Sequence, residues 1–307
     1  MRTLATVLVL LLFSVPARSA PAPAPATVWH EALLDDIATD LVAGRPLVVQ
    51  VHLPLCSNQI LRCGNDSLGD GDAPATNLYW ATSGGFVGWF GRKGSGWKQV
   101  LRARGDDPDL LEVRAWRRRV TPGAAWKRRG VDRPFDLVVV AYAWRGTAID
   151  RTVGAYLGDL FAATRRDVVL DDGSSVAAGG AAHVVAYVGH NRFMDYAPGF
   201  DFSAYERAGA GTSRRPKGHI ALACRTADYL AGADVSSAAR VPLLMTADFL
   251  FAGAHAFDGA VQTFAAGGSF AAIRAGAAAS YAAGEGKEFK RVAGAFTNPA
   301  DRRWNAP

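Results

Sequence analysis

A histidine and a cysteine in this sequence each follow a short apolar run. The run AAHVVAYVG precedes His190, and the run GHIALA precedes Cys224. Runs of this length, rich in aliphatic residues and bounded by glycine and polar residues, are typical of buried strands in a parallel sheet. Ligands of open α/β sheets bind at the carboxyl ends of such strands. An imidazole and a thiol delivered to that edge can act as a base and a nucleophile.

Other histidines are weaker candidates for the base. His183 and His219 stand at the starts of the same two runs. With about 3.3 Å of rise per residue, a strand start lies on the order of 20 Å from its end. His52 ends another apolar run and remains a rival to His190.

Further residues near the predicted strand ends could complete a site for acyl transfer. The developing oxyanion needs hydrogen-bond donors, and Asn191 and the backbone amide of Cys224 are candidates. Gly189, beside the base, leaves room for a substrate to approach closely. Asp70 and Asp72, in the LGDGD stretch, are candidates for a pocket that receives a lysine or arginine side chain. A solvated turn or a calcium-binding loop is the alternative for these two aspartates.

The chain has three cysteines, an odd number for an exported protein. Cys56 and Cys63 lie seven positions apart and predict a small disulfide loop. Cys224 is then left over as a thiol, although a pairing of Cys56 with Cys224 stays open. The spacing of Cys56 and Cys63 does not match a zinc knuckle, so we expect no metal site.

The elements that must position these residues alternate between strands and helices. Beside the two runs above, the sequence predicts strands at 45–53, 134–144 and 241–247, with a less clear one between 97 and 120. It predicts helices at 148–164, 254–266 and 269–283, the first with Thr147 as its N-cap. This alternation predicts an α/β fold with a mostly parallel open sheet and helices on both faces, a three-layer sandwich.

The amino-terminal residues resemble an export signal. Residues 1–20 have a basic start, an apolar centre and small residues at the end, as signal peptides do. A Pro/Ala-rich leader follows at 21–27, and we expect one domain over 28–307. No later apolar run approaches the roughly 20 residues that a membrane helix needs. We therefore expect a soluble protein without a membrane span, exported to the periplasm or the medium.

The net charge is mildly basic, with 34 Lys and Arg against 28 Asp and Glu. Basic residues gather at 117–119, 127–129 and 214–217. No nucleic-acid-binding motif accompanies them, so we interpret these runs as solvated loops and expect no nucleic-acid partner.

The two strand ends carry a resemblance to a known family. AYVGHN, followed by HIALACRTA, resembles the caspase-like cysteine peptidases, in which one sheet strand ends in a histidine and the next in a catalytic cysteine, often after alanine. The resemblance runs loosely over residues 47–264. It implies a caspase-like sheet and hydrolysis of peptide bonds in peptides or proteins, with Cys224 as nucleophile and His190 as base, without metal or cofactor.

One position departs from the family pattern. The family has glycine after the histidine, whereas this chain has Gly189 before His190 and Asn191 after it. The alternative function is therefore a non-catalytic binding module of the cell envelope, built on the same fold, with an inert and buried Cys224.

Overall fold

The computed structural model describes residues 25–162, 165–196, 201–209, 215–232 and 234–304. The predicted signal peptide, residues 1–20, and the first part of the leader lie outside the described residues. The last part of the predicted leader belongs to helix α1 (Pro25–Val42), which therefore begins earlier than expected.

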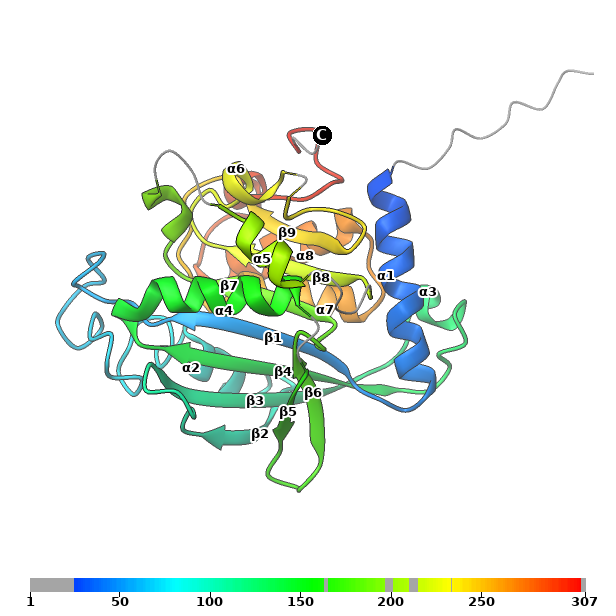
Figure 1. The fold of residues 1–307 in the computed structure, drawn as a ribbon, viewed down its shortest axis with the longest axis horizontal. Coiled ribbons are helices and arrows are strands. Elements are labelled where there is room, and N and C mark those ends of the chain that lie inside the picture. Colours follow the sequence, from blue (N-terminus) through cyan, green and yellow to red (C-terminus); the bar gives the residue numbers. More distant parts are fainter. Residues whose placement is uncertain (1–24, 163–164, 197–200, 210–214, 233, 305–307) are drawn as a thin grey trace, which may run out of the picture.

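Five parallel strands form the centre of an eight-stranded sheet (Figure 1). Their order across the sheet is β4 (Phe135–Trp144), β1 (Leu47–Pro54), β7 (Val184–Val188), β8 (Lys217–Leu222) and β9 (Arg240–Thr246). Every residue of β1, β7 and β8 is buried. Strands covered on both faces need continuous apolar runs, which is why the sequence predicts them well.

Antiparallel strands complete both edges of the sheet. They are β3 (Leu110–Val120) and β2 (Lys98–Ala103) beyond β4, and the short β10 (Phe296–Thr297) beyond β9. The region between 97 and 120 thus holds a hairpin of two strands rather than one. Strands β5 (Arg165–Val169) and β6 (Ser175–Gly179) form a separate hairpin. Most residues of β5 are exposed, so the sequence has no apolar run there that would predict a strand.

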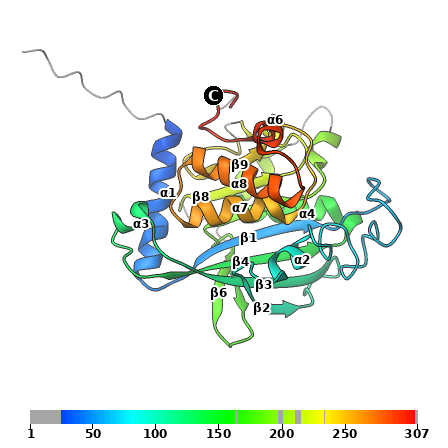
Figure 2. The same ribbon diagram turned by 180° about the vertical axis from the view of Figure 1, so that it is seen from behind.

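Helices cover both faces of the sheet, which confirms the predicted three-layer α/β sandwich. Helix α4 (Ile149–Phe161) and the short α5 (Ser203–Gly209) lie in front of the sheet in Figure 1. Helices α7 (Ala254–Ala265) and α8 (Phe270–Gly284) lie in front of it in Figure 2. The remaining helices are α1, α2 (Phe86–Gly91), α3 (Ala124–Lys127), α6 (Ala227–Leu230) and α9 (Phe289–Val292).

Alternate residues of the central strands contribute to two separate apolar cores. Val184, Ala186 and Val188 of β7 pack in the core shared with α1, α7 and α8, whereas Val185 and Tyr187 pack in the core shared with α4. This is the period of two that a β-strand imposes on its side chains.

The ends of α7 and α8 agree with the sequence, whereas α4 differs at both ends and stops at Phe161 rather than at 164. Gly267 and Gly286, just beyond α7 and α8, have positive φ angles of 84° and 61°, as C-terminal glycines often do. Helix α4 begins at Ile149, after a 3₁₀ turn over Gly146–Ala148, so the prediction of Thr147 as its N-cap is wrong. The turn is held by the Gly146 N–H, which donates to the loop carbonyl of Gly71 at 2.9 Å.

None of the helices in the described ranges combines the length and the apolar character needed to cross a membrane.

A histidine is buried at the centre of strand β8. His219 is fully buried, and its Nδ1 lies 3.1 Å from the hydroxyl of Tyr156 on α4. Burial, followed by the positive charge of Arg240, lowers the pKa of His219 to about 3. The folded chain therefore holds this imidazole in its neutral form at ordinary pH.

Protonation of His219 should make the fold less stable in acid. Between the unfolded pKa of 6.5 and the folded pKa of about 3, the unfolded state binds a proton that the folded state does not. The contribution of His219 to the free energy of unfolding should thus have its full value above about pH 6.5 and should decrease as the pH falls toward 3. We expect His219→Leu to lose less stability than the wild type between pH 7 and pH 4 in denaturant titrations. Parallel pH profiles for the two proteins would contradict this assignment.

Candidate active site

The pairing of β7 with β8 brings His190 and Cys224 to the same edge of the sheet. The last paired residues are Val188 and Leu222, and the Gly189 N–H still donates to the Leu222 carbonyl at 3.2 Å. In this register His190 falls opposite Cys224. Adjacent strands lie about 4.8 Å apart, so the two residues follow neighbouring strand ends.

Each of the two residues lies two positions beyond the last paired residue of its strand. Those paired residues, Val188 and Leu222, pack in the same apolar core. Tyr79, from the loop after β1, lines a small hollow together with His190. Burial, followed by the negative charge of Cys224, raises the pKa of Tyr79 to about 12.

Both groups are accessible to solvent. The His190 side chain is 23% exposed, and Cys224 is a free, partly exposed cysteine. The Cys224 thiol lies 3.7 Å from the carbonyl oxygen of Leu250, to which it can donate. Partial exposure is what a reactive thiol requires, whereas structural cysteines are buried.

The backbone turns sharply directly after Cys224. Arg225 has a φ of 54° and is the single non-glycine residue with positive φ in the described part of the chain. Its N–H donates to the Asp248 carbonyl at 3.0 Å, and the Thr226 hydroxyl donates to the Ala221 carbonyl at 2.6 Å. These bonds hold a conformation that costs a non-glycine residue roughly 1–2 kcal/mol. Such strained positions cluster at functional sites.

Asn191 connects the two strand ends. Its buried carboxamide donates to the Cys224 carbonyl, and its Oδ1 accepts the Phe193 N–H at 3.0 Å. The predicted donor is therefore turned toward the protein. The backbone N–H groups of Asn191 and Cys224 have no hydrogen-bond acceptor among the described residues. These two amides, rather than the carboxamide, are the donors that the site offers.

Gly189 is required for packing between strand ends. A Cβ atom at this position would lie 2.9 Å from both Cγ and Cδ of Pro54, the last residue of β1. The space beside the glycine is thus occupied by Pro54, and room for substrate at Gly189 stays a prediction.

Asp195 is the carboxylate that contacts the candidate base. Its Oδ2 lies 3.2 Å from Nε2 of His190 and 3.1 Å from Nη1 of Arg192. Asp228 and Asp248 also follow strand ends, but Asp228 pairs with Arg225 at 2.7 Å. Sequence spacing alone does not distinguish these three aspartates.

Asp70 and Asp72 lie in the exposed loop after β1. Asp72 forms an ion pair with Arg145, and Asp70 Oδ1 accepts the Asp72 N–H at 2.9 Å. Neither residue lines the hollow beside His190.

The same loop contains the predicted disulfide. Cys56 and Cys63 are joined, with Cα atoms 6.0 Å apart, and Cys224 is free. The pairing of Cys56 with Cys224 is therefore excluded.

His52 is a structural residue. It is fully buried, its Nε2 lies 3.0 Å from Oδ2 of Asp159, and its Nδ1 accepts the indole N–H of Trp144 at 3.2 Å. Both ring nitrogens are engaged on the α4 side of the sheet, so His52 does not compete with His190.

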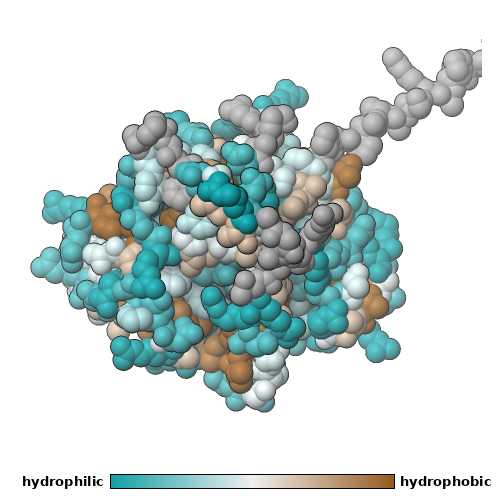
Figure 3. Space-filling model, in the orientation of Figure 1, coloured by the Kyte–Doolittle hydropathy of each residue, from teal (hydrophilic) through white to brown (hydrophobic). Residues whose placement is uncertain are grey.

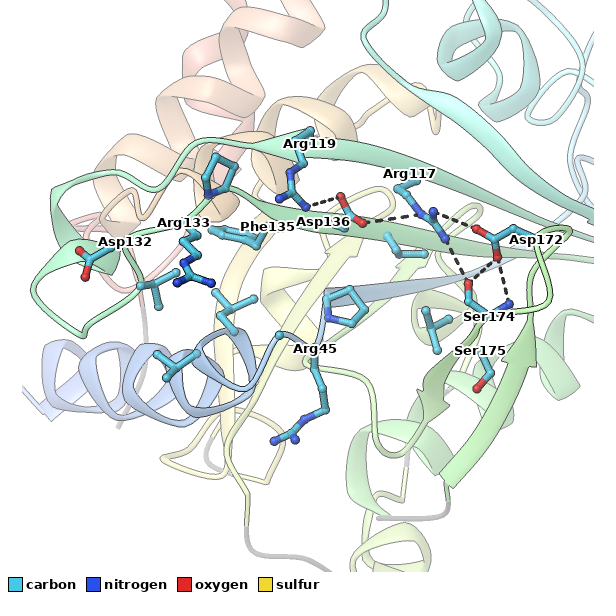
Figure 4. A pocket seen from close by; sticks show the side chains of 18 of the residues that line it. Arg45, Arg117, Arg119, Asp132, Arg133, Phe135, Asp136, Asp172, Ser174 and Ser175 are labelled. Carbon is cyan, nitrogen blue, oxygen red and sulfur yellow. Dashed lines mark hydrogen bonds and ion pairs between the residues drawn. The ribbon is translucent and has the colours of Figure 1, made fainter.

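A roomy cavity of about 800 Å³ lies at the opposite edge of the sheet, where β1 and β4 begin (Figure 4). Two of its arginines, Arg117 and Arg119, come from the basic run at 117–119 and contact carboxylates. Arg119 pairs with Asp136 at 3.0 Å, and Arg117 pairs with Asp172 at 3.1 Å. No histidine or cysteine lines this cavity within the described ranges. Residues 117–119 lie in strand β3, so the interpretation of this basic run as a solvated loop is wrong.

In the part of the chain that the structure describes, no group of three or more His, Cys, Asp or Glu side chains is arranged to hold a metal ion. Comparisons with profiles of known families, with characterised proteins and with solved structures gave no significant match.

The strained turn after Cys224 can be tested by two substitutions. Arg225→Gly and Arg225→Ala both remove the exposed pair with Asp228, but only glycine adopts φ of 54° without cost. We expect the glycine variant to exceed the alanine variant in free energy of unfolding by about 1 kcal/mol, measured with denaturant. A more stable alanine variant would show that the turn is not left-handed.

Proposed function

We propose that this chain is an exported cysteine peptidase in which Cys224 attacks the peptide carbonyl and His190 transfers the proton. The observation that carries the proposal is the position of these two residues: they follow the ends of adjacent parallel strands, and both are partly exposed. The resemblance to caspase-like cysteine peptidases assigns the same two positions the same roles. Export to the periplasm or the medium rests on residues 1–20.

The hydrogen bond to Asp195 sets the proton positions on His190. Because Nε2 faces a carboxylate oxygen at 3.2 Å, the N–H sits on Nε2 and the lone pair on Nδ1. Nδ1 then accepts the proton of the Cys224 thiol, and the negative charge of Asp195 stabilises the resulting imidazolium. The nucleophile is the thiolate that this transfer creates.

The reaction follows in two steps. The thiolate of Cys224 attacks the carbonyl carbon, a C–S bond forms, and the carbonyl electron pair moves to oxygen. As the oxyanion collapses, the C–N bond breaks and the His190 imidazolium gives its proton to the leaving amine. A water molecule, deprotonated by His190, then hydrolyses the thioester, and the thiol is regenerated. No external redox partner takes part.

The amides of Cys224 and Asn191 are suited to stabilise the oxyanion. Neither N–H is engaged among the residues described, and donors of this kind contribute strongly to acyl transfer. Asn191 stands where the family has glycine, but its side chain points inward to the Cys224 carbonyl. Tyr79, whose pKa is about 12, stays protonated and adds a hydroxyl near the thiol.

The alternative function is a non-catalytic binding module with an inert cysteine. That function needs a buried thiol, whereas Cys224 is partly exposed. Accessibility thus favours the peptidase.

Alkylation and substitution of Cys224 separate the two functions. We expect the folded, reduced protein to react with iodoacetamide at Cys224 within minutes and to cleave a casein or peptide-library substrate. Cys224→Ala should abolish both signals, because the fold contains one free thiol. If the alanine variant cleaves substrate as fast as the wild type, or the thiol reacts only after denaturation, the peptidase proposal is wrong.

The role of Asp195 is tested with a matched control. Asp195→Asn keeps the shape but removes the charge beside His190, so we expect kcat to fall by about tenfold or more with little change in KM. Asp228→Asn, which removes a carboxylate paired with Arg225 at the same edge, should leave kcat unchanged. Equal effects of the two variants would mean that Asp195 does not position the base.

A further inference from the structure

The cavity at the amino ends of the strands is large enough for a small molecule. Its volume of about 800 Å³ falls within the roughly 300–1,000 Å³ that is usual for ligand sites. Its walls come from the end of α1, the start of β4 and the β5–β6 hairpin, and Arg117 and Arg119 of β3 complete them (Figure 4). A second hollow of about 340 Å³ adjoins it, because residues 45–46 and 175–176 line both.

The surface of the molecule also favours a recess over a flat docking site. On the face that Figure 3 shows, hydrophilic residues predominate and the hydrophobic areas are small and separate. The described residues of this face therefore form no broad apolar patch of the kind that binds another protein. A small ligand enclosed by a cavity does not need such a patch.

The walls of the two hollows carry more arginines than aspartates. Among the described residues, the first hollow has four arginines and three aspartates, and the second adds two arginines and one aspartate. An excess of positive charge in a recess attracts anions, because the protein around it focuses the field there.

Two carboxylates of the cavity are already bound by protein donors. Asp136 accepts Nη1 of Arg119 at 3.0 Å. Asp172 accepts Nη1 of Arg117 at 3.1 Å and the Ser174 N–H at 3.0 Å. Hydrogen bonds from the Ser174 hydroxyl and N–H, followed by Arg117, lower the pKa of Asp172 to about 2. A cationic ligand would therefore have to displace donors that these carboxylates already bind.

The arginines, by contrast, keep donors that no carboxylate uses. A guanidinium has five N–H donors. Arg45 and Arg119 each form one ion pair with an aspartate and remain 58% and 62% exposed. The Arg133 side chain forms no hydrogen bond or ion pair within the described ranges, and Asp132 lies away from the network of Arg117, Asp136 and Asp172 in Figure 4. The cavity thus offers hydrogen-bond donors to a ligand that has acceptors.

A buried network holds Arg45 at the wall that both hollows share. Arg45 pairs with the buried Asp40, whose Oδ2 lies 3.0 Å from Nε2 of His183. Nδ1 of His183 accepts the Val48 N–H at 3.0 Å, so its proton sits on Nε2 and faces the carboxylate. His183 is therefore a structural residue that fixes the partner of Arg45. A cation that is fixed before binding loses less freedom when the ligand arrives.

Apolar side chains lie between these charged groups. Leu41 and Val42 at the end of α1, together with Val131 and Phe135 near the start of β4, line the same cavity. Val42 is 61% exposed, whereas the other three are buried. A ligand whose apolar part covers Val42 removes that side chain from water.

We propose that the cavity at the amino ends of the strands binds a small organic anion, in which a carboxylate or phosphate group is attached to an apolar body. Arg133, Arg45 and Arg119 donate to its oxygen atoms, since guanidinium groups match the geometry of both kinds of anion. The apolar body packs against Val42. The site lies at the opposite edge of the sheet from Cys224 and does not depend on the proposed peptidase function.

The first test titrates four probes onto the full-length protein by calorimetry. The probes are phenyl phosphate, benzoate, inorganic phosphate and the neutral benzyl alcohol. We expect one or both of the organic anions to bind at least about tenfold more tightly than benzyl alcohol and inorganic phosphate. The stronger of the two organic anions identifies the charged group that the site prefers. An alcohol that binds as well as the anions, or inorganic phosphate that binds as well as phenyl phosphate, would overturn the proposal.

Three variants locate the binding, and thermal melting confirms that each is folded. Arg133→Gln should weaken binding of the preferred anion by about tenfold. Arg104→Gln removes the same charge from an exposed position after β2, outside both hollows, and should bind as the wild type does. Ser175→Trp places a bulky ring on the wall shared by both hollows without changing the charge, and should abolish binding. Equal losses in the two glutamine variants, or unchanged binding by Ser175→Trp, would refute a site in this cavity.

Discussion

The parallel pairing of β7 with β8 is the constraint on which the candidate site depends. The two strands run in one direction and end at the same level, so the residues after them reach one edge together. A slip of one residue in this register would move one of the two candidate residues away from its position opposite the other. Every residue of both strands is buried, which opposes such a slip, and the carboxamide of Asn191 extends the connection beyond the strands to the Cys224 carbonyl.

The extent to which the sequence predicts the fold follows from burial. The central strands and α7 and α8 carry long apolar patterns, and their predicted bounds agree closely with the structure. Strands β2 and β5 are half exposed and charged, so their patterns resemble loops. His190 and Cys224 were recognisable because each follows a buried run. The contribution of Tyr79 was not, because its position depends on a long loop anchored by bonds such as that from Asn77 to Cys56.

Polar side chains of the sheet are satisfied by neighbours on the α4 face and at the amino ends of the strands, and are less so at the carboxyl edge. His52 and His219 lie on the α4 side, where Asp159, Trp144 and Tyr156 contact their ring nitrogens. At the amino ends of the strands, arginines are matched by aspartates (Figure 4). The carboxyl edge differs, since its reactive groups are partly open to solvent and unengaged amides lie beside them. Chemistry in this protein is therefore expected where polar groups are left incompletely satisfied, not where they are most numerous.

Under the proposed function, the disulfide between Cys56 and Cys63 and the free Cys224 impose two opposed redox requirements. A nucleophilic Cys224 works only as a thiol, because oxidation to sulfenic acid or a mixed disulfide would block it. The bond that shapes the neighbouring loop must instead remain oxidised. Mild reductants can restore the exposed thiol while sparing the buried bond, whereas strong ones attack both. The working range of such a peptidase is thus bounded on the oxidising and on the reducing side.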